Sequence, residues 1–128
     1  MPSFNPSLRD MCLRSDEPVH QAINRLEGSL TQIAFVLDGT DRLVGVVTNG
    51  DIRRFVLEGG RGSDSVQRCM NRSFRSAPPD ATREDLLKLL DLGFNAIPKV
   101  DAEGRLIEVV TPESLPTVRE APVLVRSR

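Results

Sequence analysis

The sequence has 128 residues but no tryptophan, no tyrosine, one histidine and two cysteines. Because Phe is the one aromatic type present, at five positions, the stacking side chains of single-stranded nucleic-acid binders are scarce. The 17 basic and 18 acidic residues give a formal net charge of −1, so the surplus of cations that binds nucleic-acid polymers is missing too. Cys12 and Cys69 stand in no CxxC or Cys/His spacing, which argues against a disulfide scaffold and a metal site.

Long apolar runs are also missing. No run approaches the roughly 20 residues that cross a bilayer, and the N-terminal MPSFNPSLRD has no apolar core of the signal-peptide type. We therefore expect a cytoplasmic protein with no membrane partner. The sequence lacks a glycine-rich phosphate loop, and its one histidine, His20, stands in the start of an expected helix. These absences predict that the chain has no catalytic residues and no obligatory cofactor.

The most informative feature that is present is an internal repeat. Shifted by 63 positions, residues 19–52 align without gaps on residues 82–115. The identical pairs are Leu26/Leu89, Asp38/Asp101, Arg42/Arg105, Leu43/Leu106, Val46/Val109, Val47/Val110 and Thr48/Thr111. They cluster in one stretch, which indicates a tandem duplication.

Each copy predicts a helix, two strands joined by a polar turn, and a second helix. In copy one, the first helix runs from an N-cap at Asp16 to Gly28, the strands span residues 32–37 and 42–48, and the second helix spans residues 51–58. A glycine-rich stretch, residues 59–65, predicts a flexible connector, and a short helix follows over residues 66–70.

In copy two, Thr82 and Asp85 have the spacing of a capping box. The other predicted features of this copy are a helix end at Gly93, strands over residues 95–100 and 105–111, and a last helix that Pro116 ends early. A hairpin with two helices is too small to bury both of its faces, so the copies are expected to share one core in an α+β fold. We place the first motif with its N-terminal arm at residues 1–60, the second at 61–116, and a tail or linker at 117–128.

One stretch suggests a binding site. A strand ends at Thr48 and a helix begins within three residues, so free N–H groups meet there and favour an anion. Asp51 is able to accept two hydrogen bonds from a ribose diol, and Arg53 and Arg54 are able to reach a phosphate. The same residues also suit an ordinary helix cap at Thr48 or Asn49. On these residues alone, that simpler interpretation is favoured.

The runs VLDGTDRLVGVVTNGDIRRF in copy one and AIPKVDAEGRLIEVVTPESL in copy two resemble the CBS domain, whose tandem pairs form Bateman modules. The resemblance extends from about Leu8 to Leu115. It implies two CBS motifs packed as one pseudo-two-fold module. The run GVVTNGDIRRFVLEGG is most similar to CBS pairs that precede sugar-nucleotide nucleotidyltransferase domains.

The resemblance also implies an adenosine nucleotide as a regulatory ligand. In the family, the Asp of the G-h-h-T-x-x-D pattern binds the ribose hydroxyls, and the Thr lies near ribose or phosphate. Adenine occupies an apolar slot made by the strand that opens the same copy and by the hairpins. Carried over to this sequence, the candidate site residues are Thr48, Asn49, Asp51, Arg53, Arg54, Leu13, Arg14 and Val46. This resemblance reverses the preference for a simple cap.

Copy two departs from the motif while it keeps Thr111. Glu108 replaces Gly45, and Ser114 replaces Asp51. A neutral Ser hydroxyl does not match a carboxylate, and Glu108 is expected to bring negative charge near phosphates. The second site is therefore predicted to be empty, weak or changed in ligand.

The leading hypothesis is a regulatory module that binds AMP, ADP or ATP and modulates an attached or partner enzyme, expected to be a nucleotidyltransferase. A structural homodimerisation module without nucleotide is the alternative. Five leucines of one helix, at positions 86, 87, 89, 90 and 92, give copy two an apolar surface wider than one core needs, and a homodimer through the helices is expected.

Overall fold

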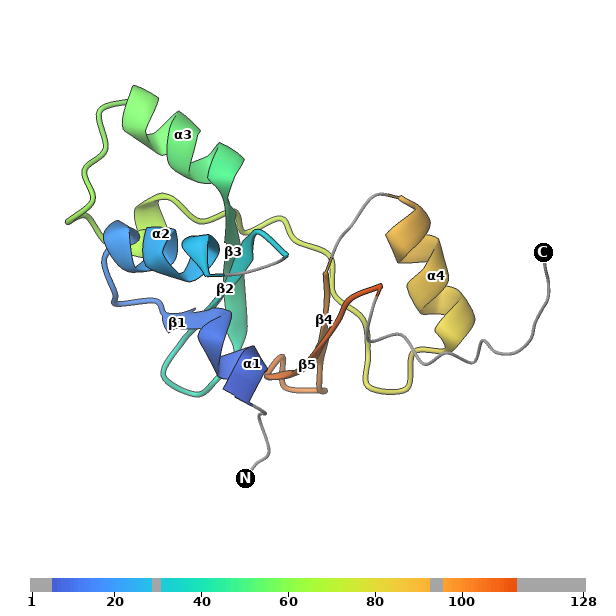
Figure 1. Cartoon of the computed structure of the whole chain (residues 1–128). Helices are drawn as coiled ribbons and strands as arrows, with labels where there is room; N and C mark the ends of the chain where they lie inside the picture. The colour runs from blue at the N-terminus through green and yellow to red at the C-terminus, as the bar shows by residue number, and fades with distance from the viewer. Residues whose placement is uncertain (1–5, 29–30, 93–95, 113–128) are drawn as a thin grey trace.

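A computed structural model of the chain describes residues 6–28, 31–92 and 96–112 (Figure 1). In chain order the elements are α1 (Pro6–Asp10), β1 (Cys12–Arg14), α2 (Val19–Glu27), β2 (Ile33–Leu37), β3 (Leu43–Thr48), α3 (Asn49–Leu57), the 3-10 turn η1 (Val66–Arg68), α4 (Arg83–Asp91), β4 (Ile97–Val100) and β5 (Leu106–Val110).

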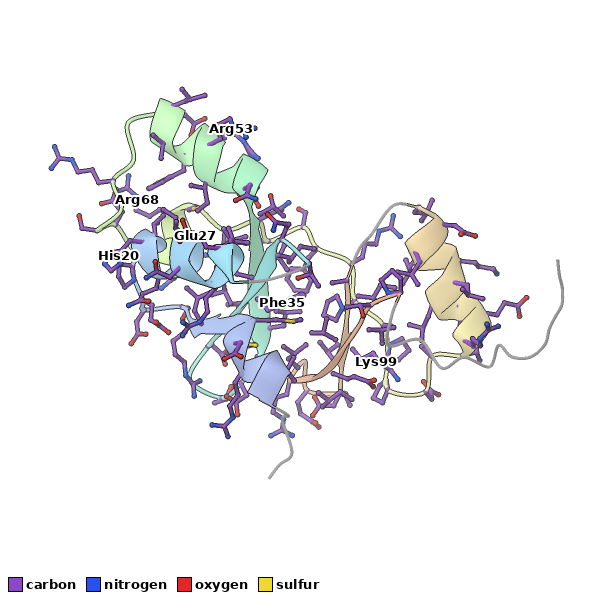
Figure 2. The ribbon with its side chains drawn as sticks, viewed as in Figure 1. His20, Glu27, Phe35, Arg53, Arg68 and Lys99 are labelled. Carbon is purple, nitrogen blue, oxygen red and sulfur yellow. The ribbon has the colours of Figure 1, made fainter. Side chains whose placement is uncertain are left out.

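Copy one is a three-stranded sheet in the order β1-β2-β3, covered by α2 and α3. β2 pairs antiparallel with β3 and parallel with β1. β2 is apolar throughout because both of its faces are covered. Ala34 and Val36 face the copy-one core, which includes Val19 and Leu26 of α2. Phe35 faces the other way, into a cluster shared with copy two (Figure 2).

Copy two repeats the hairpin at the level of the backbone. Phe35 pairs with Val46 in copy one, and Pro98 pairs with Val109 in copy two, 63 positions further on in each strand. The pairing shifts register between Val36 and Leu37, and it shifts again at the equivalent Lys99 and Val100. An irregularity that recurs at the same place confirms the duplication.

The turns of the two hairpins also match. Asp38 Oδ1 accepts the backbone N–H groups of Thr40 and Arg42, and Asp101 Oδ1 accepts those of residues 103 and 105. The fourth turn residue has a positive φ in both copies, 68° at Asp41 and 86° at Gly104. A side chain that holds its own turn is the reason an Asp occupies this position twice.

The gapless alignment is wrong for the first helices. A shift of 64 positions, not 63, relates α2 to α4. Both helices have nine residues, and this shift aligns buried Ala22 with buried Leu86. The equivalent of Leu26 is therefore Leu90, and the identity of Leu26 with Leu89 is a coincidence. Relative to the paired strands of the hairpin, α4 therefore lies one position later in the sequence than α2 does.

The two copies meet around an approximate two-fold axis at the hairpin turns. The Leu43 N–H donates to the Gly104 carbonyl at 2.9 Å, and the Leu106 N–H donates to the Asp41 carbonyl at 3.1 Å. The two bonds are related by the two-fold axis, because Leu43 is equivalent to Leu106 and Asp41 to Gly104. Behind them lies the shared core, made of Leu8, Cys12, Phe35, Leu37, Leu43, Ala96 and Leu106. The predicted α+β pair of motifs, packed as one pseudo-two-fold module, is confirmed.

Several local predictions change. α2 begins after Pro18, without a side-chain cap, so Asp16 is not its N-cap. α3 begins at Asn49, two residues earlier than expected, because Thr48 caps it. The predicted helix 66–70 is a 3-10 turn whose Val66 is buried in the copy-one core.

The connector expected to be flexible is hydrogen-bonded to the first turn of α2. The N–H groups of Val19 and His20 donate to the carbonyls of Asp64 and Gly62. This contact supplies acceptors to a helix start that has no side-chain cap. The predicted features at Gly93, Ser114 and Pro116, and the predicted tail 117–128, lie outside the described residues.

Candidate functional site

The candidate site lies where β3 ends and α3 begins. Thr48 has extended backbone angles and is the N-cap of α3. Its Oγ1 accepts the Asp51 N–H at 3.3 Å, while Asp51 Oδ2 accepts the Thr48 N–H at 2.9 Å. This reciprocal capping box fixes both side chains, and it forms because Thr and Asp stand three residues apart at a strand end.

The Asp51 carboxylate is buried, with only 6% of the residue exposed. Besides the Thr48 N–H, Oδ2 accepts the Thr48 hydroxyl at 3.0 Å. Oδ1 accepts Nη2 of Arg54 at 3.0 Å in an ion pair one helical turn away. Both carboxylate oxygens thus have partners within the chain, which is how a charge is kept in so enclosed a position.

Asn49 and Arg53 lie at the rim of the site. The Asn49 side-chain amide donates to Gln32 Oε1 at 2.6 Å, and Gln32 adopts a positive φ of 63° just before β2. Arg53, on α3 in Figure 2, has no hydrogen-bond or ion-pair partner among the described residues. Its guanidinium is available to an anion. Gln32 was not among the predicted site residues, although it directly precedes a strand that pairs with the motif.

Apolar side chains from both copies lie beside Thr48. Val46, on the same side of β3, packs against the shared core together with Ile33, Phe74 and Ala96. The Val46 backbone also exchanges two hydrogen bonds with Asn71, at 3.0 and 2.7 Å. The apolar wall near the motif is therefore built partly by copy two. The residues that the sequence named for this slot, Leu13 and Val46, both come from copy one, so Phe74 and Ala96 were missed.

Leu13 and Arg14 lie elsewhere. Thr48 pairs with Ile33 at one end of β2, whereas Arg14 pairs with Leu37 at the other end. At roughly 3.3 Å per residue, these ends are about 13 Å apart. Leu13 is buried in the copy-one core, on the face opposite Val46. The structure does not bring these two residues to the motif.

Arg14 has its own partners at the hairpin turn. Its Nη1 donates to the Asp38 carbonyl at 2.7 Å and pairs with Asp41 at 3.2 Å. A cavity of about 310 Å³ lies beside it, lined by Arg9, Cys12, Leu13, Arg14, Glu17, Leu37 and Asp41. The cations and carboxylates around this cavity balance, so it shows no preference for an anion.

In copy two, Glu108 pairs with Lys99 across the hairpin at 3.4 Å (Lys99 is labelled in Figure 2). The negative charge expected near phosphates is therefore neutralised on the sheet. The equivalent of Glu108 in copy one is Gly45, which pairs with Val36. A Cβ added at Gly45 would lie 2.6 Å from Sδ of Met70. Glycine is needed there because the chain entering copy two passes over it.

Neither cysteine has the character of a nucleophile. Burial raises the pKa of the Cys69 thiol to about 11, with the nearby Asp51 charge adding to the rise and Arg54 opposing it. Burial raises the pKa of Cys12 to about 12, against the effect of Arg25. Both thiols are protonated at neutral pH, and a protonated thiol is unreactive.

Within residues 6–28, 31–92 and 96–112, no cluster of three His, Cys, Asp or Glu side chains has the arrangement of a metal site. No helix of these same residues combines the length and apolarity that a membrane span requires. The chemistry that the described site offers is thus hydrogen bonding by a carboxylate and a hydroxyl, with arginines nearby.

Comparison with known proteins agrees with this architecture. A curated relative, inosine-5′-monophosphate dehydrogenase from Methanocaldococcus jannaschii, is 28% identical over 114 residues, or 88% of this chain. The chain spans only 22% of that enzyme's length.

Two solved structures share the fold. CBSX2 in complex with AMP has a TM-score of 0.69 and 24% identity, over 86% of this chain and 87% of that one. The cytosolic domain of the Mg²⁺ channel MgtE, in complex with ATP, has a TM-score of 0.67 and 24% identity, over 84% of this chain and 44% of that one. The family profile described as CBS domain matches residues 8–58 and 66–115, one match for each copy of the repeat. The chain therefore belongs to the CBS domain family and is a tandem CBS domain pair.

Proposed function

We propose that this CBS pair is a regulatory module that binds an adenosine nucleotide at the start of α3. The observation that carries the proposal is the buried Asp51 carboxylate, held by Thr48 in a capping box next to an apolar wall. A carboxylate fixed beside a hydroxyl suits a ribose diol, since ionised acceptors form the stronger hydrogen bonds.

The other groups take complementary roles. Arg53 and Arg54, on the first turns of α3, meet the phosphate together with the free N–H groups of the helix start. Ile33, Val46 and Phe74 surround the base. Two similar proteins support this ligand class, since CBSX2 was solved with AMP and the MgtE domain with ATP.

The chain offers a matched pair of variants to test the ligand site. Asp51 and Asp85 both complete capping boxes, with Thr48 and Thr82, but only Asp51 belongs to the family motif. We expect Asp51→Ala to weaken AMP binding at least about tenfold, because a hydrogen bond to a charged group contributes about 1.5–3 kcal/mol.

Isothermal titration calorimetry with AMP, ADP and ATP measures this effect. Asp85→Ala controls for the loss of a cap and should leave the affinity unchanged. Equal affinity of wild type and Asp51→Ala, with both folded by circular dichroism, removes Asp51 from the site.

The proposal also names the class of enzyme that the module regulates. A sugar-nucleotide nucleotidyltransferase is proposed from the resemblance of residues 45–60 alone. The curated relative is a different enzyme, a dehydrogenase, so it supports attachment to an enzyme rather than this class of partner. Addition of the module to candidate nucleotidyltransferases, with and without AMP, tests the partner by a change in their nucleotidyl-transfer rate.

Dimer formation is a second candidate role, favoured by one observation. Val56 and Leu57 of α3 are 53% and 79% exposed, and Leu92 at the end of α4 is 66% exposed. Of the other leucines of α4, Leu86 is buried in copy two's own core, and Leu87, Leu89 and Leu90 are partly buried against it. Light scattering tests this role: a dimer that Leu57→Glu dissociates supports it, and a wild-type monomer at high concentration rejects it.

A further inference from the structure

We propose that Arg54 competes with the ligand for Asp51, so that the site selects molecules carrying both a diol and a phosphate. This inference rests on the proposed nucleotide site and concerns its selectivity. It arises from a conflict in the structure: the carboxylate assigned to the ribose is buried, and both of its oxygens are already bonded.

The two oxygens are not equally available. Oδ2 is bonded to the N–H and the hydroxyl of Thr48, and both bonds belong to the cap of α3. Giving them up opens the capping box and leaves only the bond from the Asp51 N–H to Thr48 Oγ1. Oδ1 is bonded to Arg54 alone among the described residues. A ligand therefore gains access to Asp51 through Oδ1. This oxygen has one acceptor site left beside Arg54, so both hydroxyls of a diol bond to it only after Arg54 has moved.

Arg54 is suited to move. Its side chain is 60% exposed, while that of Asp51 is 7% exposed, so the arginine end of the ion pair is the one in contact with solvent. Only the carboxylate of this ion pair is buried, so the arginine can leave it for solvent, and the ligand's hydroxyls must then bond the carboxylate in its place. Arg53, next to it, has no hydrogen-bond or ion-pair partner among the described residues, so it breaks no bond to them when it contacts a phosphate.

This arrangement discriminates between ligands. Adenosine displaces Arg54 from Asp51 and offers the guanidinium no anion in return. AMP displaces the same bond, but its phosphate becomes the new partner of the freed Arg54. The ion pair thus lowers the affinity for nucleosides and leaves the affinity for nucleotides nearly unaffected. The selectivity arises because Arg54 exchanges the Asp51 carboxylate for the ligand's phosphate.

Titration calorimetry with adenosine and with AMP tests the proposal on wild type, Arg54→Ala and Arg53→Ala. Arg54→Ala should bind adenosine about two- to fivefold more tightly than wild type, which is ~0.4–1 kcal/mol at about 1.4 kcal/mol per tenfold change. It should bind AMP more weakly, so that the preference for AMP over adenosine falls about tenfold or more. Arg53→Ala removes the same charge from the same helix and should leave adenosine affinity unchanged.

The outcomes separate this inference from the proposed function. If wild type binds AMP but Arg54→Ala binds adenosine no more tightly than wild type does, the competition is wrong and the nucleotide site stands. The same holds if Arg53→Ala and Arg54→Ala raise adenosine affinity equally. If wild type binds neither AMP nor adenosine, the nucleotide site itself is rejected, and the competition with it.

Discussion

Gly45 of copy one and Glu108 of copy two occupy equivalent positions in the two hairpins, opposite Val36 and Lys99. Gly45 is covered by the Met70 side chain. Glu108 is 54% exposed along its side chain and forms an ion pair on the sheet. The same backbone thus carries a close-packed crossing in one copy and an open, charged surface in the other.

The comparison separates the features that both copies share from those that copy one alone has. The turn aspartates, the register shift and the bonds around the two-fold axis occur in both copies, because every hairpin of this kind needs them. Gly45, Asn49 and Asp51 occur only in copy one, around the candidate site.

The shared core should unite the two copies in one unfolding transition, and its loss has the largest expected effect. Leu43 and Leu106 are equivalent and are both buried in it. Leu43→Ala and Leu106→Ala should each lower the free energy of unfolding by about 2–5 kcal/mol, through lost burial and a cavity. Urea unfolding followed by circular dichroism measures this change, and Leu57→Ala, at an exposed site, should be close to neutral. Two separate transitions, each shifted by one variant only, would contradict a shared core.

Replacing Gly45 by the residue that copy two has at the equivalent position, Glu108, should have the next largest effect on stability. A Cβ at position 45 lies 2.6 Å from Sδ and 3.1 Å from Cβ of Met70, so Gly45→Glu forces the Met70 side chain to move. We expect a loss of about 1–3 kcal/mol of unfolding free energy. Thermal unfolding is a sufficient measurement.

Two further variants make this comparison specific. Met70→Ala removes the Sδ and Cγ atoms in conflict and should recover part of the loss in the double variant. Glu108→Ala, at the equivalent position, breaks an ion pair whose glutamate end is 54% exposed and should cost less than about 1 kcal/mol. A Gly45→Glu protein as stable as wild type would show that Met70 does not constrain this position.

The smallest expected effect concerns the turn aspartates. N–H donors of Thr40 and Arg42 lower the pKa of Asp38, and the Arg105 N–H, followed by its side chain, lowers the pKa of Asp101, each from an ordinary value of 3.8. A lowered folded-state pKa stabilises the protein above the unfolded value, and this contribution is lost as pH falls through the folded value. Asp38→Asn and Asp101→Asn should therefore be less stable than wild type near pH 6, with the difference vanishing well below pH 3.8.

Salt distinguishes the two turns. Asp101 also accepts Nε of Arg105 at 3.1 Å in an exposed ion pair, whereas Asp38 is held by backbone and hydroxyl donors of its own turn. At about 1 M salt the screening length is about 3 Å. The effect of Asp101→Asn should shrink there more than that of Asp38→Asn. Equal salt dependence in the two series would show that the Arg105 side chain adds nothing.

Local patterns predicted the elements of this protein well. The two hairpins, their polar turns and the capping box of Thr82 with Asp85 each depend on a few neighbouring residues, so a short sequence window contains the cause. The end of α2 at Gly28 was predicted for the same reason. The wrong N-cap at Asp16 arose because the helix start is stabilised by Asp64 and Gly62, more than 40 residues away.

By itself, the sequence determined that the chain is a duplicated hairpin-and-helix unit of the CBS family and that Thr48 and Asp51 stand together at a strand end. Only the tertiary structure decided that Arg54 occupies the carboxylate, that Arg14 lies at the far end of the sheet, and that copy two supplies part of the apolar wall. The physical reason is the range of the forces involved. Hydrogen bonds within a turn follow from adjacent residues, whereas burial and the meeting of charges depend on which distant segments the shared core brings together.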